Sequence, residues 1–462
     1  MNQARVPTSL RSGTGLRCAL AGLLVLLVNV SALAAAPEPG ADEMILSLDR
    51  ALEIARRDNP RIAIGRARRA GAEGARVRSR QGFSPRLTVD AYHLRLDTSV
   101  LDNIPTFEPE FPPLFVRRDF GPLDGNVASV ELVQPLINVG AWNARRQTGR
   151  ALEAAELDLH RARREVDVAV VEAYFGARTA RRQVEAERKG LATAQRALRQ
   201  AEAGFEQELI PPVDVLSART RVSEMQARVA AARARVVGAH AVLRQVLGTD
   251  ADVELTLTDP VPRPKPPAAQ APERRQVLSG RRDLRALEQG VEAAEYGVKR
   301  ARSAWIPDLN LYARYDRVDA NDPLDFNETG WLVALNLRWT PFLGFSQVGA
   351  VDEAEATEAE TRAQLRALRQ QAWAEARTEH ANWRAEVEGW QSASSGVADA
   401  QEALALTEAR YAEGLDDITA LLRAQAEELA ARTREINARF NAVVAAERYR
   451  LAVSSDSPWV RP

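Results

Sequence analysis

Residues 152–184 read LEAAELDLHRARREVDVAVVEAYFGARTARRQV, and the expected fold rests on the pattern of apolar residues in this segment. Its apolar residues return every seven positions, along one line made of Leu152, Leu159, Val166, Ala173 and Ala180. A companion line runs from Val170 to Phe205 with the same spacing. A sustained seven-residue repeat is typical of coiled-coil helices. We therefore expect one helix from about 144 to 208, roughly 95 Å long at 1.5 Å per residue.

A second helix is expected directly after this one, beyond a polar turn that contains Pro211 and Pro212. It carries two seams of its own, Val215 to Leu243 and Ala218 to Val246, again in steps of seven. Such seams are far more often coiled-coil packing than a chemical motif. The two helices therefore predict a long antiparallel hairpin.

Two short strands are expected before the hairpin. A helix begins after Ser47, ends at Asn59-Pro60, and is followed by a second helix over about 61–80. Pro85 then breaks the helical pattern, and alternating apolar residues predict strands near 86–97 and 127–134, the latter closed by Pro135. The segment 98–125 between them is rich in Pro, Phe, Asp and Gly and is expected to be a long loop.

The same order of elements returns after the proline-rich segment 259–272. A helix over 281–304, strands near 306–316 and 330–339, a loop over 317–329 and a second hairpin are expected, with junctions at Pro307 and Pro341. Pro85 and Pro307 are 222 residues apart, whereas Leu216 and Leu422 are 206 apart. In one respect the halves disagree: when Pro135 is aligned with Pro341, the apolar alternation of their strands is out of phase by one residue.

These patterns divide the chain into four parts. Residues 1–34 are predicted to be a secretory signal peptide, because a basic start precedes an apolar run and then small residues. Residues 35–258 form a first repeat, 259–280 a proline-rich connector and 281–462 a second repeat. The only cysteine, Cys18, lies within the signal, so no disulfide is expected in the mature chain.

Composition and motifs argue against several classes of function. The 62 Lys and Arg balance 63 Asp and Glu, which gives no nucleic-acid footprint. The four histidines lack metal-ligand spacing, and no phosphate loop, nucleophile elbow or paired-carboxylate motif stands out. We therefore expect no enzyme activity, cofactor or metal site.

The four expected strands of one chain are too few to close a membrane β-barrel by themselves, because single-chain outer-membrane barrels begin at eight strands. An open sheet edge is not tolerated in lipid, because its backbone groups would lack partners. Four strands can close with copies of themselves, and three copies give twelve strands. The edges therefore predict a homotrimer whose barrel is wide enough to hold water.

The chain resembles the TolC family of outer-membrane efflux proteins over essentially the whole mature sequence. Four sets of residues carry the resemblance: the opening motif Leu48, Ala51, Leu52, Ala55, Asn59 and Pro60; the helix-to-strand junctions Phe83-Ser-Pro-Arg-Leu and Trp305-Ile-Pro-Asp-Leu; the strand-to-helix junctions Gln134-Pro-Leu and Thr340-Pro-Phe; and the tip motif Tyr411-x-x-Gly414 with Leu422-x-Ala424-Gln425. Each motif is weak alone, but their order and duplication make the set specific.

The resemblance implies a mostly α fold with a small β part. An α-helical coiled-coil barrel in the periplasm would continue into a trimeric twelve-stranded β-barrel in the outer membrane. It also implies docking onto a periplasmic adaptor and an inner-membrane pump or ABC exporter, in a tripartite efflux or type I secretion system. Two other classes fit the patterns less well: a soluble periplasmic coiled-coil adaptor, which has one hairpin among many strands, and an outer-membrane enzyme such as a lipase.

The same resemblance gives the expected site residues. The periplasmic tip and gate would contain Phe205, Asp214, Leu216, Tyr411, Gly414, Asp416, Asp417, Leu422 and Arg423. The helix–strand junctions are Pro85, Pro135, Pro307 and Pro341.

The gate of the family cannot be carried over residue by residue. Its narrowing pair of aspartates aligns with Ala420 and Arg423. Asp416 and Asp417 either rebuild that ring one turn earlier, with Arg423 as their ion-pair partner, or are solvated helix caps. Two further expectations concern segments outside the tip. The connector is either a strap around the tunnel or a spacer, and 98–125 is the longer extracellular loop, reachable near Pro112.

Overall fold

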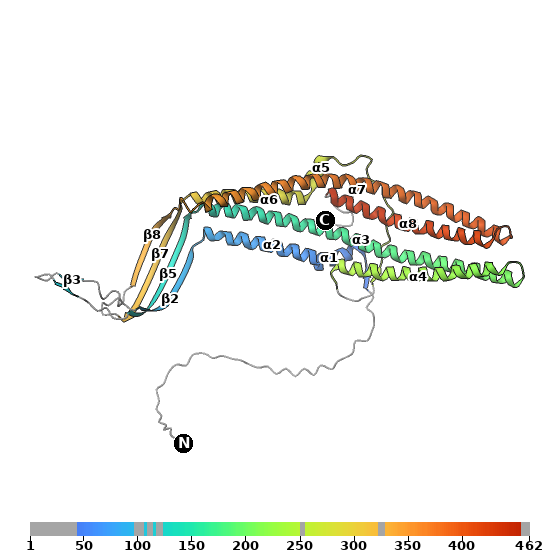
Figure 1. Cartoon of the computed structure of the whole chain (residues 1–462), viewed down its shortest axis with the longest axis horizontal. Helices are drawn as coiled ribbons and strands as arrows, with labels where there is room; N and C mark the ends of the chain where they lie inside the picture. The colour runs from blue at the N-terminus through green and yellow to red at the C-terminus, as the bar shows by residue number, and fades with distance from the viewer. Residues whose placement is uncertain are drawn as a thin grey trace, which may run out of the picture. The chain divides into compact units, whose positions relative to one another are not determined.

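The computed structural model describes residues 44–96, 106–108, 114–116, 123–249, 255–321 and 329–453. The predicted signal peptide, the loop position Pro112 and residues 322–328 of the predicted 317–329 loop lie outside these residues. All described residues belong to one compact unit, Glu43–Pro462. Figure 1 shows long helices that lead at one end into a sheet.

Two hairpins of nearly equal size dominate the unit. The first joins α3 (Val139–Glu206) to α4 (Pro212–Leu247), and the second joins α7 (Ser346–Ala412) to α8 (Ile418–Val453). Helices α3 and α7 have 68 and 67 residues, and α4 and α8 have 36 each. Sixty-eight residues give a helix of roughly 100 Å. The matching lengths agree with an internal duplication, whereas the domain boundaries stay predictions.

Shorter helices precede each hairpin: α1 (Leu48–Asp58), α2 (Pro60–Arg78) and the 3₁₀ turn η1 (Ser79–Gly82) in the first half, and α5 (Arg274–Gly280), α6 (Arg282–Arg302) and η2 (Ser303–Trp305) in the second. The predicted cap of α1 is confirmed, because the Ser47 side chain accepts a hydrogen bond from the Arg50 amide at 3.3 Å. Within the described residues, no helix combines the length and the apolar character that a membrane crossing would require.

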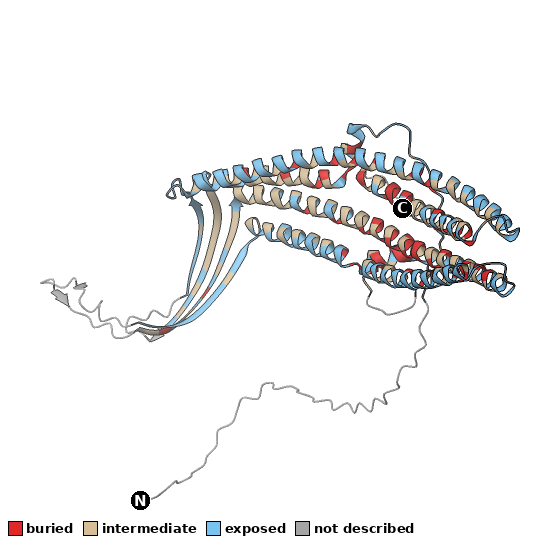
Figure 2. Cartoon of the chain, turned by 45° about the vertical axis from the view of Figure 1, so that its right-hand side comes forward, coloured by how far each residue is buried: buried red, intermediate tan, exposed pale blue. Residues whose placement is uncertain are grey.

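The predicted seams are the packed faces of the helices. On α3 Leu152, Leu159 and Val166 are buried, and on α4 Ala218 and Met225 are buried. Alanine and valine predominate along these seams, so neighbouring backbones approach closely. Figure 2 shows the buried residues concentrated in the helical part, whereas the strands are mostly exposed or intermediate.

The largest apolar core among the described residues lies where β1, the beginning of the connector and the first hairpin meet. Strand β1 (Met44–Leu46) pairs in parallel with β6 (Leu255–Leu257) beside α1. The buried Tyr174 hydroxyl donates to the Leu46 carbonyl at 2.9 Å and accepts from the Asp259 amide at 3.0 Å. The Asp259 carboxylate in turn accepts from the Leu48 amide at 2.6 Å. Tyr174 therefore fixes both β1 and the beginning of the connector to α3.

The four predicted strands form one antiparallel sheet in the order β2-β5-β7-β8. Their bounds are β2 Arg86–Leu96, β5 Leu123–Ile137, β7 Asp308–Asn321 and β8 Thr329–Arg338. Residues 123–125, 317–321 and 329, predicted as loop, are therefore strand. Inside the predicted 98–125 loop, β3 (Thr106–Glu108) pairs with β4 (Leu114–Val116).

The prediction that Pro135 closes its strand is wrong. Strand β5 continues to Ile137, and its register against β7 shifts between Pro135 and Ile137. The pairing with β2 already ends at Val133, so β5 is an edge strand beyond that point. A residue without an N–H group is tolerated there. The shift leaves Leu136 as one extra residue on β5, which is the pattern of a β-bulge.

The other junction prolines lie where the sequence predicts a change of element. Pro85 and Pro307 each precede the first residue of a strand, and Pro341 lies between β8 and α7. Proline has no backbone N–H group, and at these boundaries no N–H is required to donate to a neighbouring strand.

The connector is bound to the second hairpin and contains the short helix α5. The Pro262 carbonyl accepts from Arg439 Nε at 3.1 Å, and the Ala268 carbonyl lies 3.0 Å from His380 Nε2. The Arg263 guanidinium lies over the Trp390 ring, 5.6 Å from its centroid. These contacts favour a strap over a mere spacer.

Candidate functional site

One face of the sheet is apolar and exposed. The register places Leu87, Leu132, Ala313 and Val333 in one row across the four strands. The next row contains Val89, Val130, Tyr315 and Trp331. Trp331 is 78% exposed and Leu335 68%. Contiguous exposed apolar surface of this kind marks contact with lipid or with another protein.

The opposite face is polar. Thr88, Glu131 and Arg314 form one row on it, and Asn310 lies opposite Asn336 in another. The Tyr312 hydroxyl donates to Glu131 at 3.2 Å, and Arg314 forms an ion pair with Asp316 at 2.7 Å. A sheet with one apolar and one polar face suits a wall between lipid and water.

The tip of the second hairpin closes with a Schellman turn. Gly414 has φ +75, its N–H donates to the Tyr411 carbonyl, and the Leu415 N–H donates to the Arg410 carbonyl. The Arg410 guanidinium holds both carboxylate oxygens of Asp416, at 2.8 and 2.9 Å. This hydrogen-bonded ion pair lowers the pKa of Asp416 below its ordinary value.

Asp417 begins α8. Its carboxylate accepts from the Ala420 amide at 2.7 Å, which is the bond of a helix N-cap. The expected partner Arg423 is exposed, and the guanidinium that binds Asp416 belongs to Arg410 instead. A role of the two aspartates in a gate stays a prediction. In this structure Asp416 forms an ion pair with Arg410, and Asp417 caps α8.

The tip of the first hairpin closes in the same way with different residues. Glu208 has φ 59, its N–H donates to the Phe205 carbonyl, and the Leu209 N–H donates to the Gly204 carbonyl. An alanine-type β-carbon on Gly204 would lie 3.5 Å from Ile210, so Ile210 covers this glycine. The residues that carry positive φ, Glu208 and Gly414, are 206 apart, which is the spacing that the sequence predicts.

The predicted tip residues divide into a packed and an exposed set. Tyr411 and Leu422 pack against a buried cluster of Ala197, Ile418 and Leu421, which joins α3 to α8. Burial raises the pKa of Tyr411, and the nearby Asp214 carboxylate adds to the effect. Phe205 and Leu216 are exposed, together with Leu209 and Val213. We call these four residues the apolar tip patch.

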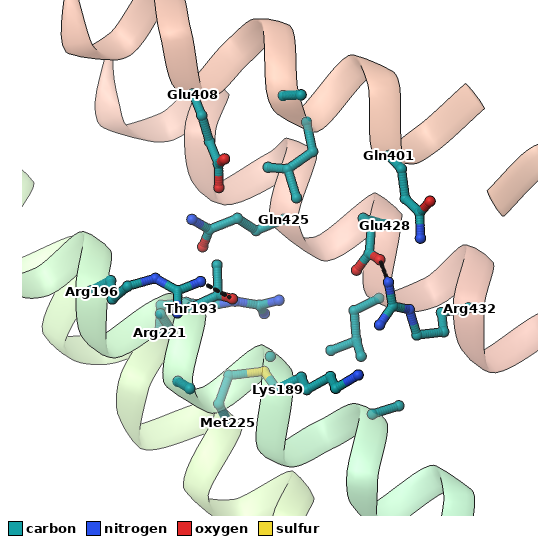
Figure 3. Close-up of a pocket in the computed structure, with 17 residues that line it drawn as sticks. Lys189, Thr193, Arg196, Arg221, Met225, Gln401, Glu408, Gln425, Glu428 and Arg432 are labelled. Carbon is teal, nitrogen blue, oxygen red and sulfur yellow. Dashed lines mark hydrogen bonds and ion pairs between the residues drawn. The ribbon is translucent and has the colours of Figure 1, made fainter. Parts of the chain in front are cut away.

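A polar groove of about 480 Å³ separates the two hairpins above their tips. Figure 3 shows Lys189, Thr193 and Arg221 on the first hairpin facing Glu408 and Gln425 on the second. The tip motif contained Gln425, but nothing in the heptads indicated a groove. The described residues contain no group of three or more His, Cys, Asp or Glu that could hold a metal ion.

Comparisons with known proteins agree with this geometry. The sequence matches the family described as outer membrane efflux protein over residues 51–249 and 274–453. It is 29% identical over 336 residues to protein CyaE of Bordetella pertussis, with 67% of each chain covered.

Solved structures share the fold at lower identity. The CmeC outer membrane channel of Campylobacter jejuni superposes with a TM-score of 0.77 at 15% identity, covering 88% of this chain and 85% of that one. VceC, an outer membrane protein of Vibrio cholerae, gives 0.73 at 19% identity, covering 88% and 96%. This chain belongs to the outer membrane efflux protein family, and it is an outer-membrane channel component for efflux or secretion with a helical tunnel in the periplasm.

Proposed function

We propose that three copies of this chain form the channel, with a twelve-stranded barrel to which each copy contributes β2, β5, β7 and β8. The single observation that carries the proposal is the amphipathic four-stranded sheet with two free edges. Among the described residues β2 pairs only with β5, and β8 only with β7. An edge of this kind cannot stay open in lipid.

The directions of the edge strands permit closure between copies. Each neighbouring pair in the sheet is antiparallel, so β2 and β8 run in opposite directions. Strand β8 of one copy can therefore pair with β2 of the next and continue the antiparallel order. Two copies give eight strands, whose interior is filled by side chains, whereas twelve strands leave room for water.

The hairpin tips suit a proteinaceous partner. The apolar tip patch offers exposed Phe205, Leu209, Val213 and Leu216 at one turn, and the polar groove lies next to it. We propose that a periplasmic adaptor docks here and connects the channel to an inner-membrane pump or an ABC exporter. The soluble adaptor considered above fits less well, because it has one hairpin among many strands.

The gate belongs to the same proposal. Around a threefold axis the tips of the second hairpin would lie together, so that Asp416 and Asp417 of three copies line the entrance. The passage itself supplies no energy, and transport is driven from the inner membrane. No catalytic residue is proposed.

Closure through the edge strands can be tested by cysteine pairing, because Cys18 is the only native cysteine. Thr88→Cys is combined in turn with Leu332→Cys, Ala334→Cys or Asn336→Cys, all on the polar face. After oxidation of outer membranes, at least one pair should give covalent dimers and trimers and nothing larger.

A matched control is the pair Ser129→Cys and Asp316→Cys, which lie opposite each other on β5 and β7 of one chain. This control should give monomers only. Monomers from all three edge pairs, or a ladder that extends beyond trimers, would exclude a closed trimeric barrel.

A further inference from the structure

Four exposed arginines meet where the sheet joins the helices. They are Arg78 at the end of α2, Arg86 at the start of β2, Arg300 near the end of α6 and Arg338 at the end of β8. All four line one hollow of about 520 Å³. We call them the junction collar.

The positive charge of this collar is only partly balanced. The carboxylates that line the same hollow are Glu131 and Asp308, and Glu131 already accepts a hydrogen bond from Tyr312. None of the four arginines forms an ion pair with another part of the chain that the structure describes. Neighbouring arginines behave differently, since Arg302 is paired with Glu355 and Arg314 with Asp316.

The sheet register fixes the face on which the collar lies. Arg86 lies opposite Val133, which lies opposite Tyr312, and Arg338 lies opposite Asp308. Tyr312 and Asp308 are four residues apart on β7 and so point to the same face. This is the polar face, opposite to Trp331 and Leu335. In the trimeric channel proposed above, on which this inference rests, that face surrounds the water-filled passage.

We propose that the junction collar attracts anions and makes the passage selective for anionic, carboxylate-bearing solutes over cations. Each copy brings four guanidinium groups and two carboxylates to one level of the channel. The field of a charge extends over about 10 Å in 0.1 M salt. A narrow passage lined by charges of one sign therefore raises the local concentration of counter-ions. Guanidinium groups also bind carboxylates through paired hydrogen bonds.

The test measures the reversal potential of the purified protein in planar bilayers under a KCl gradient. The wild type should pass chloride in preference to potassium, and citrate should reduce its current. The variant Arg78→Gln, Arg86→Gln, Arg300→Gln, Arg338→Gln should lower the chloride-to-potassium permeability ratio about threefold or more, and it should lose most of the citrate block.

A control of equal charge replaces Arg199, Arg228, Arg233 and Arg235 by glutamine. These residues are exposed on α3 and α4, away from the sheet. The control should keep the wild-type permeability ratio. If the fourfold collar variant does not insert, the strand pair Arg86→Gln, Arg338→Gln takes its place, and the wild-type ratio is informative without any variant.

Two results overturn the inference: a wild-type channel that prefers potassium, or a collar variant whose ratio equals that of the wild type. Both leave the channel itself intact. Absence of trimers and of any conductance in the wild type would instead contradict the proposed function, so the two failures are distinguishable.

Discussion

The two hairpin tips close with the same backbone geometry but with different side chains. In both, a Schellman turn places one residue at positive φ, Glu208 in the first tip and Gly414 in the second. Gly204 and Arg410 occupy the same position near the end of the first helix of the two hairpins. Each is contacted by the residue six positions later, through an apolar contact in the first tip and through an ion pair in the second. Ile210 covers Gly204, whereas Asp416 binds Arg410.

The difference shows how a duplicated element keeps its shape while its chemistry changes. The first tip starts its second helix with Pro211 and Pro212, which need no cap bond. The second tip uses the Asp417 carboxylate as a cap. Among the described residues of the first turn, 204–212, no ion pair is formed, whereas the second turn is closed by an exposed ion pair that responds to pH and salt.

The largest expected effect concerns the positions with positive φ. Gly414→Ala should destabilise the second tip by about 1–2 kcal/mol, the cost of a β-carbon in the left-handed region. A β-carbon at Gly414 would meet no atom within 4 Å, so the cost is backbone strain alone. Glu208→Gly should have the opposite sign and a smaller size, about 0.5 kcal/mol, because glycine also loses more entropy on folding.

Hydrogen exchange of the tip peptides in the assembled protein measures both variants. Faster exchange over 404–422 is expected for Gly414→Ala, and slower exchange over 198–216 for Glu208→Gly. If Gly414→Ala leaves exchange unchanged, Gly414 does not hold the left-handed turn in the assembled protein.

The helix cap gives the next effect. Asp417→Ala should remove the bond to the Ala420 amide and destabilise the first turn of α8 by about 1 kcal/mol. Pro211→Ala, at the equivalent place in the first hairpin, breaks no side-chain cap bond and should change exchange little. Equal effects from the two variants would show that Asp417 is not a cap in solution.

The ion pair predicts a pH dependence confined to the second tip. The bond from Arg410 lowers the pKa of Asp416 below its ordinary 3.8, so the pair stabilises the tip above that pH. The stabilisation is lost as the pH falls below 3.8 and Asp416 is protonated. A spin label on Leu415→Cys should therefore keep its mobility down to pH 3.8 and become more mobile as the pH falls further, whereas one on Leu209→Cys should not.

High salt provides the control at constant pH, because it screens an exposed ion pair and leaves an apolar contact intact. Raising the salt at pH 7 should mobilise the Leu415 label and leave the Leu209 label unchanged. Equal responses of the two labels to both acid and salt would contradict the contrast between the tips.

The smallest effect is expected on conduction. If the aspartates line the entrance, the double variant Asp416→Ala, Asp417→Ala should raise single-channel conductance or weaken block by divalent cations. Ile210→Ala at the first tip should do neither. Unchanged conductance and block, together with altered values in Tyr411 variants, would place the gate at Tyr411. Asp416 would then serve only as the ion-pair partner of Arg410, and Asp417 only as the cap of α8.

The sequence predicted what one-dimensional patterns encode. Burial at every seventh residue and alternation next to prolines were enough for both hairpins and all four strands, and the spacing of 206 located both turns. The predictions from the sequence failed where the outcome depends on which segments lie next to each other in the folded chain. Pro135 stays within β5 because β2 has already ended, and Asp416 binds Arg410 across the turn rather than Arg423. The Tyr174–Asp259 contact joins segments 85 residues apart and had no sequence signal.

We propose that the free sheet edges assemble this chain into a trimer, and native mass spectrometry of the protein released from outer membranes counts the chains in the assembly. A single assembly with the mass of three mature chains is expected. A monomer with a folded sheet, or an assembly of two chains, would contradict the trimer.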